Sequence, residues 1–546
     1  MEFNELVGDI LVLVYEYSSY ESELSIDAWK RKLELLKVCS HWRQLLVSKV
    51  YGDIVVRIGV ENNRRGRHWL MNNWNNGYPN VVFTNASLMT SNRMQHMARN
   101  IYIYPTCIYN HVYGIDEVVK VLGMYSHIWA TINTISIHIS QMRITENTPR
   151  FIFDTFGGLA RDVTGEMLEM FPSAKRFCLT NKSCSFNGDY LFKKIAQSYS
   201  GQISQLVSDR GFTKNIAEFS AHLTHLDIPL MGKSTKYIPK IYAASLKYLR
   251  LCEVPQNYSW KCFAGTDASG SVCFPNLKAL EVIYATRFNA PVAKRKCRHY
   301  RHPIKFFSLQ RLGIEGRPGH CCILECSKFF GPLRDLRVAG PASNLKTLAE
   351  SSMPQASNVT LAVDEKSGLA DASLASMLNG ICKKSNARAT SIYAKRSDIF
   401  IDPSQLACFS LTSLAIHAPT DVRQLMVLTE RFPCLERVGL RSVTFNHIPE
   451  NALLVRSGAF IQQPLQPLDT RIRSMYLKFS CYGDLAQNAN ACMAYLLLRT
   501  SSLRQFAADA HVFSAIGDII KDYSPFYRHL EDIEFLNVNF AWPDEF

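Results

Sequence analysis

A short pattern of apolar positions recurs along most of the chain. Each copy has an apolar residue, two variable residues, a second apolar residue, one variable residue and a third apolar residue. The strictest copies have Leu at the first two positions and Leu, Ile or Val at the third, and they begin at Leu223, Leu246, Leu277, Leu309, Leu333 and Leu411. Because leucine is about a tenth of the residues, roughly one such copy is expected by chance. The excess predicts a repeated structural unit.

Weaker copies extend the pattern in both directions. They begin at Ala98, Ile132, Ala174, Ala356, Ala389, Leu435, Ile472, Leu503 and Leu530. The second and third apolar residues flank one residue of an extended chain, so both point to the same face of a strand. One copy cannot bury that face alone, and we therefore expect neighbouring copies to stack around a continuous core. The uneven intervals between copies predict an irregular curve.

The segments between copies favour helical connections. Residues 241–244 and 372–382 are able to form helices, and Phe171-Pro172, Phe274-Pro275 and Phe432-Pro433 place a proline just before a strand, where the missing N–H does no harm. The predicted fold class is therefore α/β, with parallel strands and helical connections stacked into an irregular solenoid. A conventional α/β domain with parallel strands would show a similar alternation and is the alternative.

The first sixty residues have a different, helical pattern. An apolar stripe with the spacing of an amphipathic helix consists of Leu6, Ile10, Leu13, Val14 and Tyr17. Asp9 lies in the first turn of this helix, where a negative charge suits the helix dipole. A second stripe with helical spacing consists of Leu35, Val38, Cys39, Trp42 and Leu46. The β-branched run from Ile54 to Ile58 then predicts a strand.

These N-terminal residues resemble an F-box, the module that docks a Skp-type adaptor in cullin-based ubiquitin ligases. The resemblance covers residues 3–52 and rests on Leu6, Asp9-Ile10-Leu11, Tyr17 and Val38-Cys39-x-x-Trp42-Arg43. Val7 replaces the proline that usually follows the first leucine, and the spacer after Tyr17 is longer than usual. The resemblance implies an adaptor-binding face made of Leu6, Asp9, Ile10, Leu13, Val14, Tyr17, Leu35, Val38, Cys39, Trp42 and Arg43. The alternative is an apolar helical cap on the repeats.

An F-box followed by leucine-rich repeats resembles the F-box/leucine-rich-repeat proteins, and the uneven repeats are similar to those of divergent fungal members. This resemblance implies an F-box-like module at residues 1–58, a connecting segment or atypical first repeat at 59–97, and a leucine-rich-repeat solenoid at 98–546. It implies a substrate-recognition subunit that binds a Skp-type adaptor and a cullin complex through the N-terminal helices and a target protein through the solenoid. Such a protein is not itself an enzyme. A repeat scaffold outside any ligase is the alternative function.

The chain contains little that is typical of a catalytic site. Gly313-x-x-Gly316-x-x-Gly319 has the wrong spacing for a dinucleotide loop, and no Gly-x-Ser-x-Gly elbow is present. His222-x-x-His225 lacks the glutamate of a zinc-protease helix, and we interpret His225 as a surface histidine of a repeat. We expect no cofactor.

The stretch from residue 294 to 326 is the most unusual chemically. It begins with a run of basic residues without an acid, which contains Lys294, Arg295, Lys296, Arg298, Arg301 and Lys305. This run predicts a solvated loop, a nuclear import signal or a phosphate-contacting loop, and a nucleic-acid-binding protein centred on it is the less favoured alternative. Nearby side chains of the type that binds zinc are Cys297, His299, His302, His320, Cys321, Cys322 and Cys326. Their spacing matches no established zinc finger, so we expect no metal.

The composition is that of a folded protein, and the charge favours an acidic partner. The formal charge is +14, although residues 1–60 contain nine acidic and seven basic residues, so the positive excess lies in the repeats. We therefore expect the target to be acidic or phosphorylated. Sixteen cysteines are too few for a disulfide scaffold, and no apolar run is long enough for a membrane span. We expect mostly reduced and buried thiols, no membrane partner, and a cytoplasmic or nuclear location.

Overall fold

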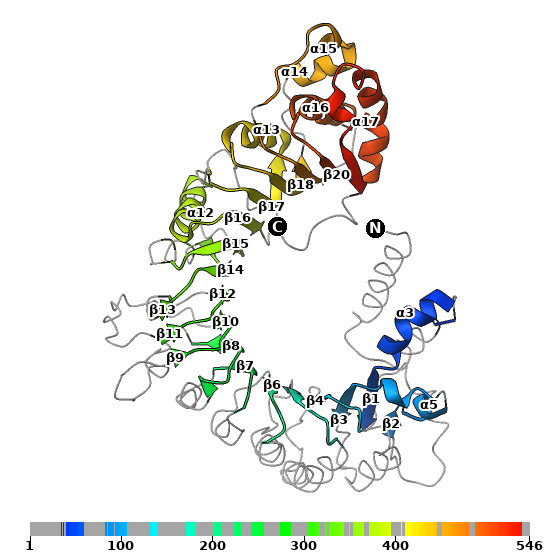
Figure 1. Cartoon of the computed structure of the whole chain (residues 1–546), viewed down its shortest axis with the longest axis vertical. Coiled ribbons are helices and arrows are strands. Elements are labelled where there is room, and N and C mark those ends of the chain that lie inside the picture. Colours follow the sequence, from blue (N-terminus) through cyan, green and yellow to red (C-terminus); the bar gives the residue numbers. More distant parts are fainter. Residues whose placement is uncertain are drawn as a thin grey trace, which may run out of the picture. The chain divides into compact units, whose positions relative to one another are not determined.

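The computed structural model describes the chain in segments. These are residues 34, 36–37, 40–58, 82–84, 86–91, 93–105, 130–139, 171–181, 201–208, 222–230, 242–255, 273–285, 304–316, 323–324, 327–342, 345, 349, 353–364, 371–394, 406, 410–444, 450–468, 470–479 and 486–537. They belong to two compact units, Met1–Cys252 and Glu253–Phe546 (Figure 1). Within the described segments, each unit contains an open, mostly parallel sheet with few helices, so the predicted α/β class is confirmed.

In the first unit, each strand pairs in parallel with the strand that follows it along the sheet. The order is β1 (Asp53–Ile58), β3 (Asn100–Pro105), β4 (Thr134–Ile139), β5 (Arg176–Asn181), β6 (Gln205–Ser208), β7 (His225–Pro229) and β8 (Tyr248–Val254). Strand β2 (Val82–Thr84) pairs antiparallel with β1. The helical elements described in this unit are α3 (Ser40–Val50), α5 (Ala86–Ser91) and the 3-10 turn η2 (Gln95–Met97).

The second unit repeats this arrangement in a longer sheet. Its parallel strands are, in order, β10 (Ala279–Tyr284), β12 (Arg311–Glu315), β14 (Leu333–Gly340), β15 (Ala356–Val363), β16 (Ala389–Ala394), β17 (Ser413–Asp421), β18 (Arg437–Thr444), β19 (Ser474–Phe479), β20 (Gln505–Ala508) and β21 (Glu534–Asn537). A separate small parallel sheet has β11 (Ile304–Phe306) between β9 (Cys273–Phe274) and β13 (Ser327–Phe329).

Helices become frequent toward the end of the second unit. They are α12 (Asp371–Ser385), α13 (Val422–Arg431), α14 (Glu450–Leu453), η7 (Leu454–Ser457), α15 (Ala459–Gln462), α16 (Ala486–Arg499), α17 (Ala510–Tyr523) and η8 (Arg528–Leu530). Figure 1 shows α12, α13, α16 and α17 along one side of the sheet. The predicted helix at 372–382 is thus confirmed by α12. In the described part of 241–244, Tyr242 is helical and the two residues after it form a turn.

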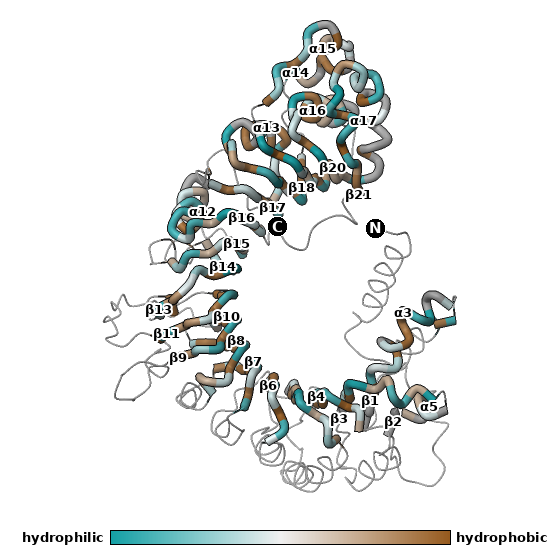
Figure 2. The backbone as a smooth tube through the Cα atoms, in the orientation of Figure 1, coloured by the Kyte–Doolittle hydropathy of each residue, from teal (hydrophilic) through white to brown (hydrophobic). Residues whose placement is uncertain are grey.

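The apolar motif accounts for the core of both sheets. Along β10, residues alternate between half-buried and buried, so Leu280 and Val282 point to one face. Figure 2 shows that hydrophobic positions recur along the strands of both units. Leu280 pairs with Leu312 on β12, and Leu312 pairs with Leu336 on β14, so equivalent motif positions stack from strand to strand. Each fully buried leucine stabilises the fold by about 2 kcal/mol relative to an exposed one.

The first motif residue packs in the turn before each strand, and the backbone of this turn joins neighbouring copies. The residue after the first motif position supplies a carbonyl that accepts two N–H groups from the next copy. For example, Gln310 O accepts from Arg334 N at 2.8 Å and from Asp335 N at 3.0 Å. Thr412 O likewise accepts from Glu436 N and Arg437 N. Stacking therefore satisfies the backbone where the strands begin.

Two of the weaker copies are displaced by two residues from their predicted positions. Leu361 on β15 pairs with Ile392 on β16, so this copy begins at Ala387 and not at Ala389. Its second position is Thr390, a buried polar residue whose Oγ1 lies 3.5 Å from the Sγ atom of Cys382 on α12. The last copy is also displaced, because Phe535 on β21 pairs with Phe506 on β20.

Two further strands belong to the same pattern. Ile203 and Leu206 are buried and begin a copy on β6. The third position of this copy is Ser208, a polar residue, so the copy does not match the apolar pattern. Tyr51 and Ile54 begin another copy on β1, which pairs with β3. The predicted strand after Gly52 is thus confirmed, although it belongs to the sheet. The division of the chain at residues 58 and 97 stays a prediction.

Local sequence explains where individual elements begin and end. At the start of α13, Gln424 Oε1 accepts the backbone N–H of Asp421 at 3.1 Å, as in a capping box. Val422, Leu425 and Leu428 are buried on the inner side of this helix. Gly316 follows β12 with φ +87°, where an added Cβ would lie 2.8 Å from the carbonyl oxygen of Tyr284. Gly316 therefore permits a close turn, which is a structural role for a glycine whose spacing does not fit a dinucleotide loop.

The expectation of buried thiols holds only in part. None of the six cysteines that the structure describes forms a disulfide, yet only Cys382 and Cys492 among them are buried, and Cys273 is exposed. Burial raises the pKa of Cys492 to about 12, and the nearby charge of Asp421 acts in the same direction. This thiol is therefore protonated and unreactive at neutral pH. None of the helices in the described segments has the length and apolarity needed to cross a membrane.

We predict that the motif leucines, and not the polar residues between them, hold the sheet together. Leu312→Ala removes a buried side chain and should lower the free energy of unfolding by about 3 kcal/mol. Gln310→Ala, two residues away, should change it by less than about 0.5 kcal/mol, because only the Gln310 backbone joins the neighbouring copy. Urea unfolding followed by circular dichroism would measure both. Equal losses from the two variants would contradict this account of the core.

Candidate protein-binding surface

Most of the predicted adaptor-binding residues lie outside the described segments. These are Leu6, Asp9, Ile10, Leu13, Val14, Tyr17, Leu35, Val38 and Cys39. Trp42 and Arg43 lie on α3, and the exposed Arg43 donates from Nε to the carbonyl oxygen of Leu36 at 3.2 Å. Leu46 and Val50, on the same helix, are buried. The described part of this helix therefore already uses some of its apolar residues within the fold.

The predicted basic run is described only at its end. Lys294, Arg295, Lys296, Arg298 and Arg301 lie outside the described segments, as do the possible metal ligands Cys297, His299, His302, His320, Cys321, Cys322 and Cys326. Lys305 is half-buried on β11. Within the described segments, no group of three His, Cys, Asp or Glu side chains is arranged to hold a metal ion.

His225 has the surroundings of a structural histidine. Its Nδ1 atom lies 2.9 Å from Thr224 Oγ1, and its ring stacks on Tyr248 with a centroid distance of 5.9 Å. Burial lowers the pKa of His225, and the charges of Arg176 and Lys247 act in the same direction. The ring is therefore neutral at pH 7 and belongs to a stack of side chains along the sheet.

The sequence also predicts that the residue after the first leucine of each strict copy is exposed on the strand face and able to contact a target. All six of these residues lie near solvent. Lys247, Lys278, Gln310 and Arg334 are exposed, and Thr224 and Thr412 are half-buried. Their position differs from the prediction, because they lie where the turn enters the strand and not on the face of the strand. Their backbone groups pair with the neighbouring copies whatever the side chain. The hydroxyl groups of Thr224 and Thr412 add a hydrogen bond each, to the carbonyl oxygens of Ser204 and Arg388.

The turns before several strands carry a row of positive charge in the second unit, which we call the basic rim. The basic rim consists of the exposed residues Arg388, Arg437, Arg471, Arg473 and Arg504. They lie in or next to the turns before β16, β18, β19 and β20, and neighbouring strands of a sheet are about 4.8 Å apart. Glu436 is the one acidic side chain among the described residues of these turns.

The guanidinium groups of the basic rim lack acidic partners. Among the described residues, Arg388, Arg437, Arg471 and Arg473 form no ion pair, and Arg504 Nη1 donates to the backbone oxygens of Ser501 and Leu503. Arginine is well suited to bind a carboxylate or phosphate with two parallel hydrogen bonds. The basic rim is therefore available for an anionic partner.

The turns of β12 and β14 show the contrasting arrangement. Arg311 Nε lies 3.3 Å from Asp335 Oδ2, and Arg334 Nε lies 3.7 Å from the same oxygen. Asn358 Nδ2 also donates to Asp335 Oδ1 at 2.9 Å. One carboxylate thus partly neutralises two arginines here, which makes this part of the sheet a poorer anion site than the basic rim.

The face of the sheet opposite the motif leucines carries an aromatic stack on β16 and β17. The rings of Tyr393 and His417 are nearly parallel, with centroids 3.9 Å apart and an interplanar angle of 15°. Burial lowers the pKa of His417 to about 4, and the charge of Arg441 acts in the same direction. At neutral pH the imidazole is uncharged and stabilises this part of the sheet by stacking.

The arginines of the basic rim were not predicted as binding residues, because most of them lie on the weaker copies of the motif. The rule that selected Lys247 and Arg334 would also have selected Arg473 and Arg504, which follow Ile472 and Leu503. Arg388 could be found only with the copy placed correctly at Ala387. The signal was therefore in the sequence, but the strict leucine pattern did not reach it.

Comparisons with known proteins add no further information about this surface. No family model matches the chain, and no curated protein matches its sequence.

We predict that His417 makes the fold sensitive to acid. Its pKa is lower in the folded than in the unfolded chain, so its protonation destabilises the fold as the pH falls from about 6.5 to about 4. Over this range the wild type should lose about 2 kcal/mol more of its unfolding free energy than a His417→Phe variant, with allowance for partial exposure. Chemical denaturation at a series of pH values would measure this. The exposed His96, changed to Phe, is the control, and parallel pH profiles for all three proteins would contradict the prediction.

Proposed function

We propose that this protein is a non-catalytic receptor that binds an acidic or phosphorylated target protein along the basic rim. The observation that carries the proposal is the row of exposed arginines in or next to the turns before β16, β18, β19 and β20, which form no ion pair with another described residue. Five rigidly spaced guanidinium groups offer several weak contacts at once, which favours an extended acidic segment over a single small anion. Electrostatic attraction of this kind also accelerates association.

The repeats themselves are proposed to be leucine-rich repeats stacked into an irregular solenoid. Three features support this proposal. The strands follow one another in parallel within each unit, the motif residues are buried, and each turn pairs with the next through one shared carbonyl. Solenoids of this kind provide long surfaces for protein partners, which agrees with a role in recognition.

The N-terminal residues give the receptor its proposed place in a ubiquitin ligase. Their resemblance to an F-box suggests docking to a Skp-type adaptor, which would link this chain to a cullin complex. The target would then be held near a ubiquitin-charged enzyme, and the rate of transfer would rise because the effective concentration rises. The ligase chemistry would reside in the partner subunits.

A repeat scaffold outside any ligase is the second candidate function. It is favoured by the burial of Leu46 and Val50 on α3, directly before β1, because a helix packed in this way can serve as a cap on the sheet. The two candidates differ in whether the residues from Leu6 to Trp42 bind another protein.

We predict that the full chain co-purifies with a Skp-type adaptor in equal amounts. A variant with Leu13→Asp and Trp42→Ala should stay folded by circular dichroism and lose the adaptor, because an apolar docking face does not tolerate a charge. A variant with Arg437→Gln and Arg473→Gln should still capture the adaptor, since the basic rim serves the target. A folded wild type that captures no adaptor would leave the scaffold function.

We predict separately that the basic rim binds acidic peptides. With a fluorescent oligoglutamate peptide as probe, the variant with Arg437→Gln and Arg473→Gln should bind about tenfold more weakly than the wild type. The matched control is Arg311→Gln with Arg334→Gln, which removes the same charge from the pair neutralised by Asp335 and should change affinity less than about twofold. Fluorescence anisotropy at increasing salt would measure both. Binding that is insensitive to salt, or equal losses in the two variants, would contradict this role.

A further inference from the structure

The small sheet β9–β11–β13 is built from the residues that precede β10, β12 and β14 of the main sheet in the second unit. Phe274 is followed by Leu277 at the start of the next motif copy, and Phe306 is followed in the same way by Leu309. The phenylalanines of the three strands form a column, with centroid distances of 5.5 Å from Phe274 to Phe306 and 5.6 Å from Phe306 to Phe329. Each copy thus adds one short strand and one ring to this column.

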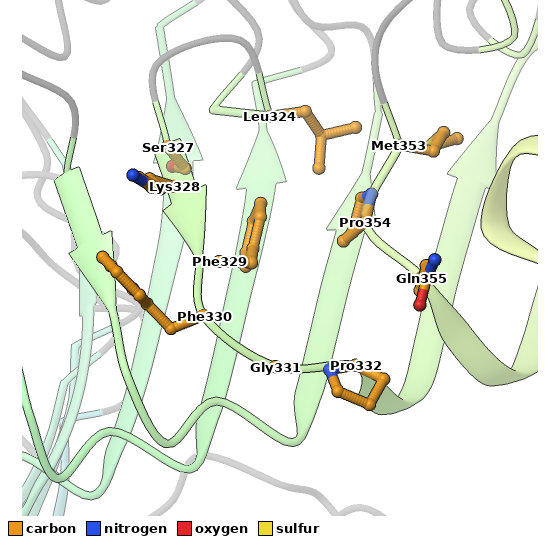
Figure 3. Close-up of a pocket in the computed structure, with 10 residues that line it drawn as sticks. All are labelled: Leu324, Ser327, Lys328, Phe329, Phe330, Gly331, Pro332, Met353, Pro354 and Gln355. Carbon is orange, nitrogen blue, oxygen red and sulfur yellow. The ribbon is translucent and has the colours of Figure 1, made fainter.

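The column stops at β13, although the repeats continue. The residues that precede the next main strand, β15, are Met353, Pro354 and Gln355. Pro354 has no backbone N–H and is therefore a poor choice for a fourth strand. A cavity of about 500 Å³ lies at this place, between β13 and the Met353–Gln355 segment. Figure 3 shows Phe329, Leu324, Met353 and Pro354 around it.

The exposed edge of β13 offers backbone groups to this cavity. The N–H of Phe330 donates to Phe306 O on β11, and backbone groups alternate in direction along a strand. The N–H and C=O groups of Phe329 therefore point away from β11, toward the cavity. An edge of this kind is able to pair with one more extended chain.

The side chains beside the cavity are apolar and basic. Phe330 is 47% exposed and stacks on Phe307, which is 46% exposed, at a centroid distance of 4.3 Å. Lys328 Nζ lies 5.1 Å from the centroid of the Phe330 ring, and Lys328 pairs in register with Lys305 on β11. Neither lysine forms an ion pair with another described residue. Large exposed aromatic rings of this kind are typical of binding surfaces.

We propose that this groove binds an extended segment of a partner protein, which adds a fourth strand to the small sheet. One apolar side chain of the segment continues the column beyond Phe329 and fills the cavity against Leu324 and Met353. An acidic side chain of the same segment lies near Lys328 and Lys305. This site is separate from the basic rim, so it does not depend on the proposed function, and it gives the protein a second means of binding a partner.

The groove favours a peptide over a single-stranded nucleic acid. Stacked rings and lysines occur in sites for either ligand. However, the cavity lies beside a strand edge, and a strand edge pairs with a peptide backbone. A nucleic-acid strand would use the rings and lysines but leave this edge unpaired.

The test uses the full chain and three fluorescent probes. The first is the peptide Gly-Ser-Glu-Phe-Glu-Val-Glu-Ser-Gly, the second is the same peptide with N-methylated Phe and Val, and the third is oligouridine. We expect the first peptide to bind saturably below about 1 mM in an anisotropy titration, and the N-methylated peptide to bind at least about tenfold more weakly, because it cannot pair with β13. Oligouridine should not compete with the peptide.

Variants locate the binding on the protein. Phe330→Ala and Lys328→Glu should each weaken the first peptide by about tenfold. Phe526→Ala removes another exposed ring of the same unit and should leave affinity unchanged. An unfolding midpoint equal to that of the wild type shows that a variant is folded. If Phe330→Ala is not folded, the affinity of Lys328→Glu alone tests the site. The proposal is overturned by the absence of saturable binding, by equal binding of the N-methylated peptide, by equal losses in Phe330→Ala and Phe526→Ala, or by displacement of the peptide by oligouridine.

Discussion

The stacking of one motif copy on the next is the constraint on which the rest of this structure depends. A copy such as that on β12 has only a short strand, and it buries Leu312 and Ile314 only because β10 and β14 lie on either side. The turn before the strand reinforces the same register, because Gln310 O receives two N–H groups from the next copy. Side-chain burial and backbone pairing thus select the same alignment of neighbours.

The copies are held together by the motif side chains and by the backbone of the turns, and this explains where binding residues can lie. At the turn position, the backbone joins the copies and the side chain lies at or near the surface, so lysine, glutamine, arginine or threonine are all compatible with the stack. Function can therefore change at this position without loss of the core. The same logic applies to the small sheet, where Phe274, Phe306 and Phe329 stack until Pro354 ends the series and leaves a groove.

The sequence predicts the α/β class and most strands of the main sheets, because burial on one face of a short strand imposes a strict apolar spacing. It fails where another interaction replaces an apolar side chain. Thr390 occupies a core position beside Cys382, and Ser208 ends a motif copy that is buried nonetheless. The adaptor-binding residues stay a prediction, since Leu6 to Tyr17 lie outside the described segments.

The candidate sites were harder to predict than the core. The charge of the repeats indicates an acidic partner, but only the strand register shows that Arg437 and Arg473 lie on neighbouring copies while Arg311 and Arg334 share Asp335. The groove beside β13 has no signal in the linear sequence, because it depends on the absence of a strand that the repeat would otherwise add.

The most direct test of the stacked ladder is amide hydrogen exchange of the full chain. Arg334, Thr412 and Arg473 have side chains near solvent, yet their N–H groups donate to carbonyls of neighbouring turns. We predict that these amides exchange as slowly as those in the centres of β12, β17 and β19. Rapid exchange at these turns, with slow exchange confined to the strand centres, would contradict the claim that the turns join one copy to the next.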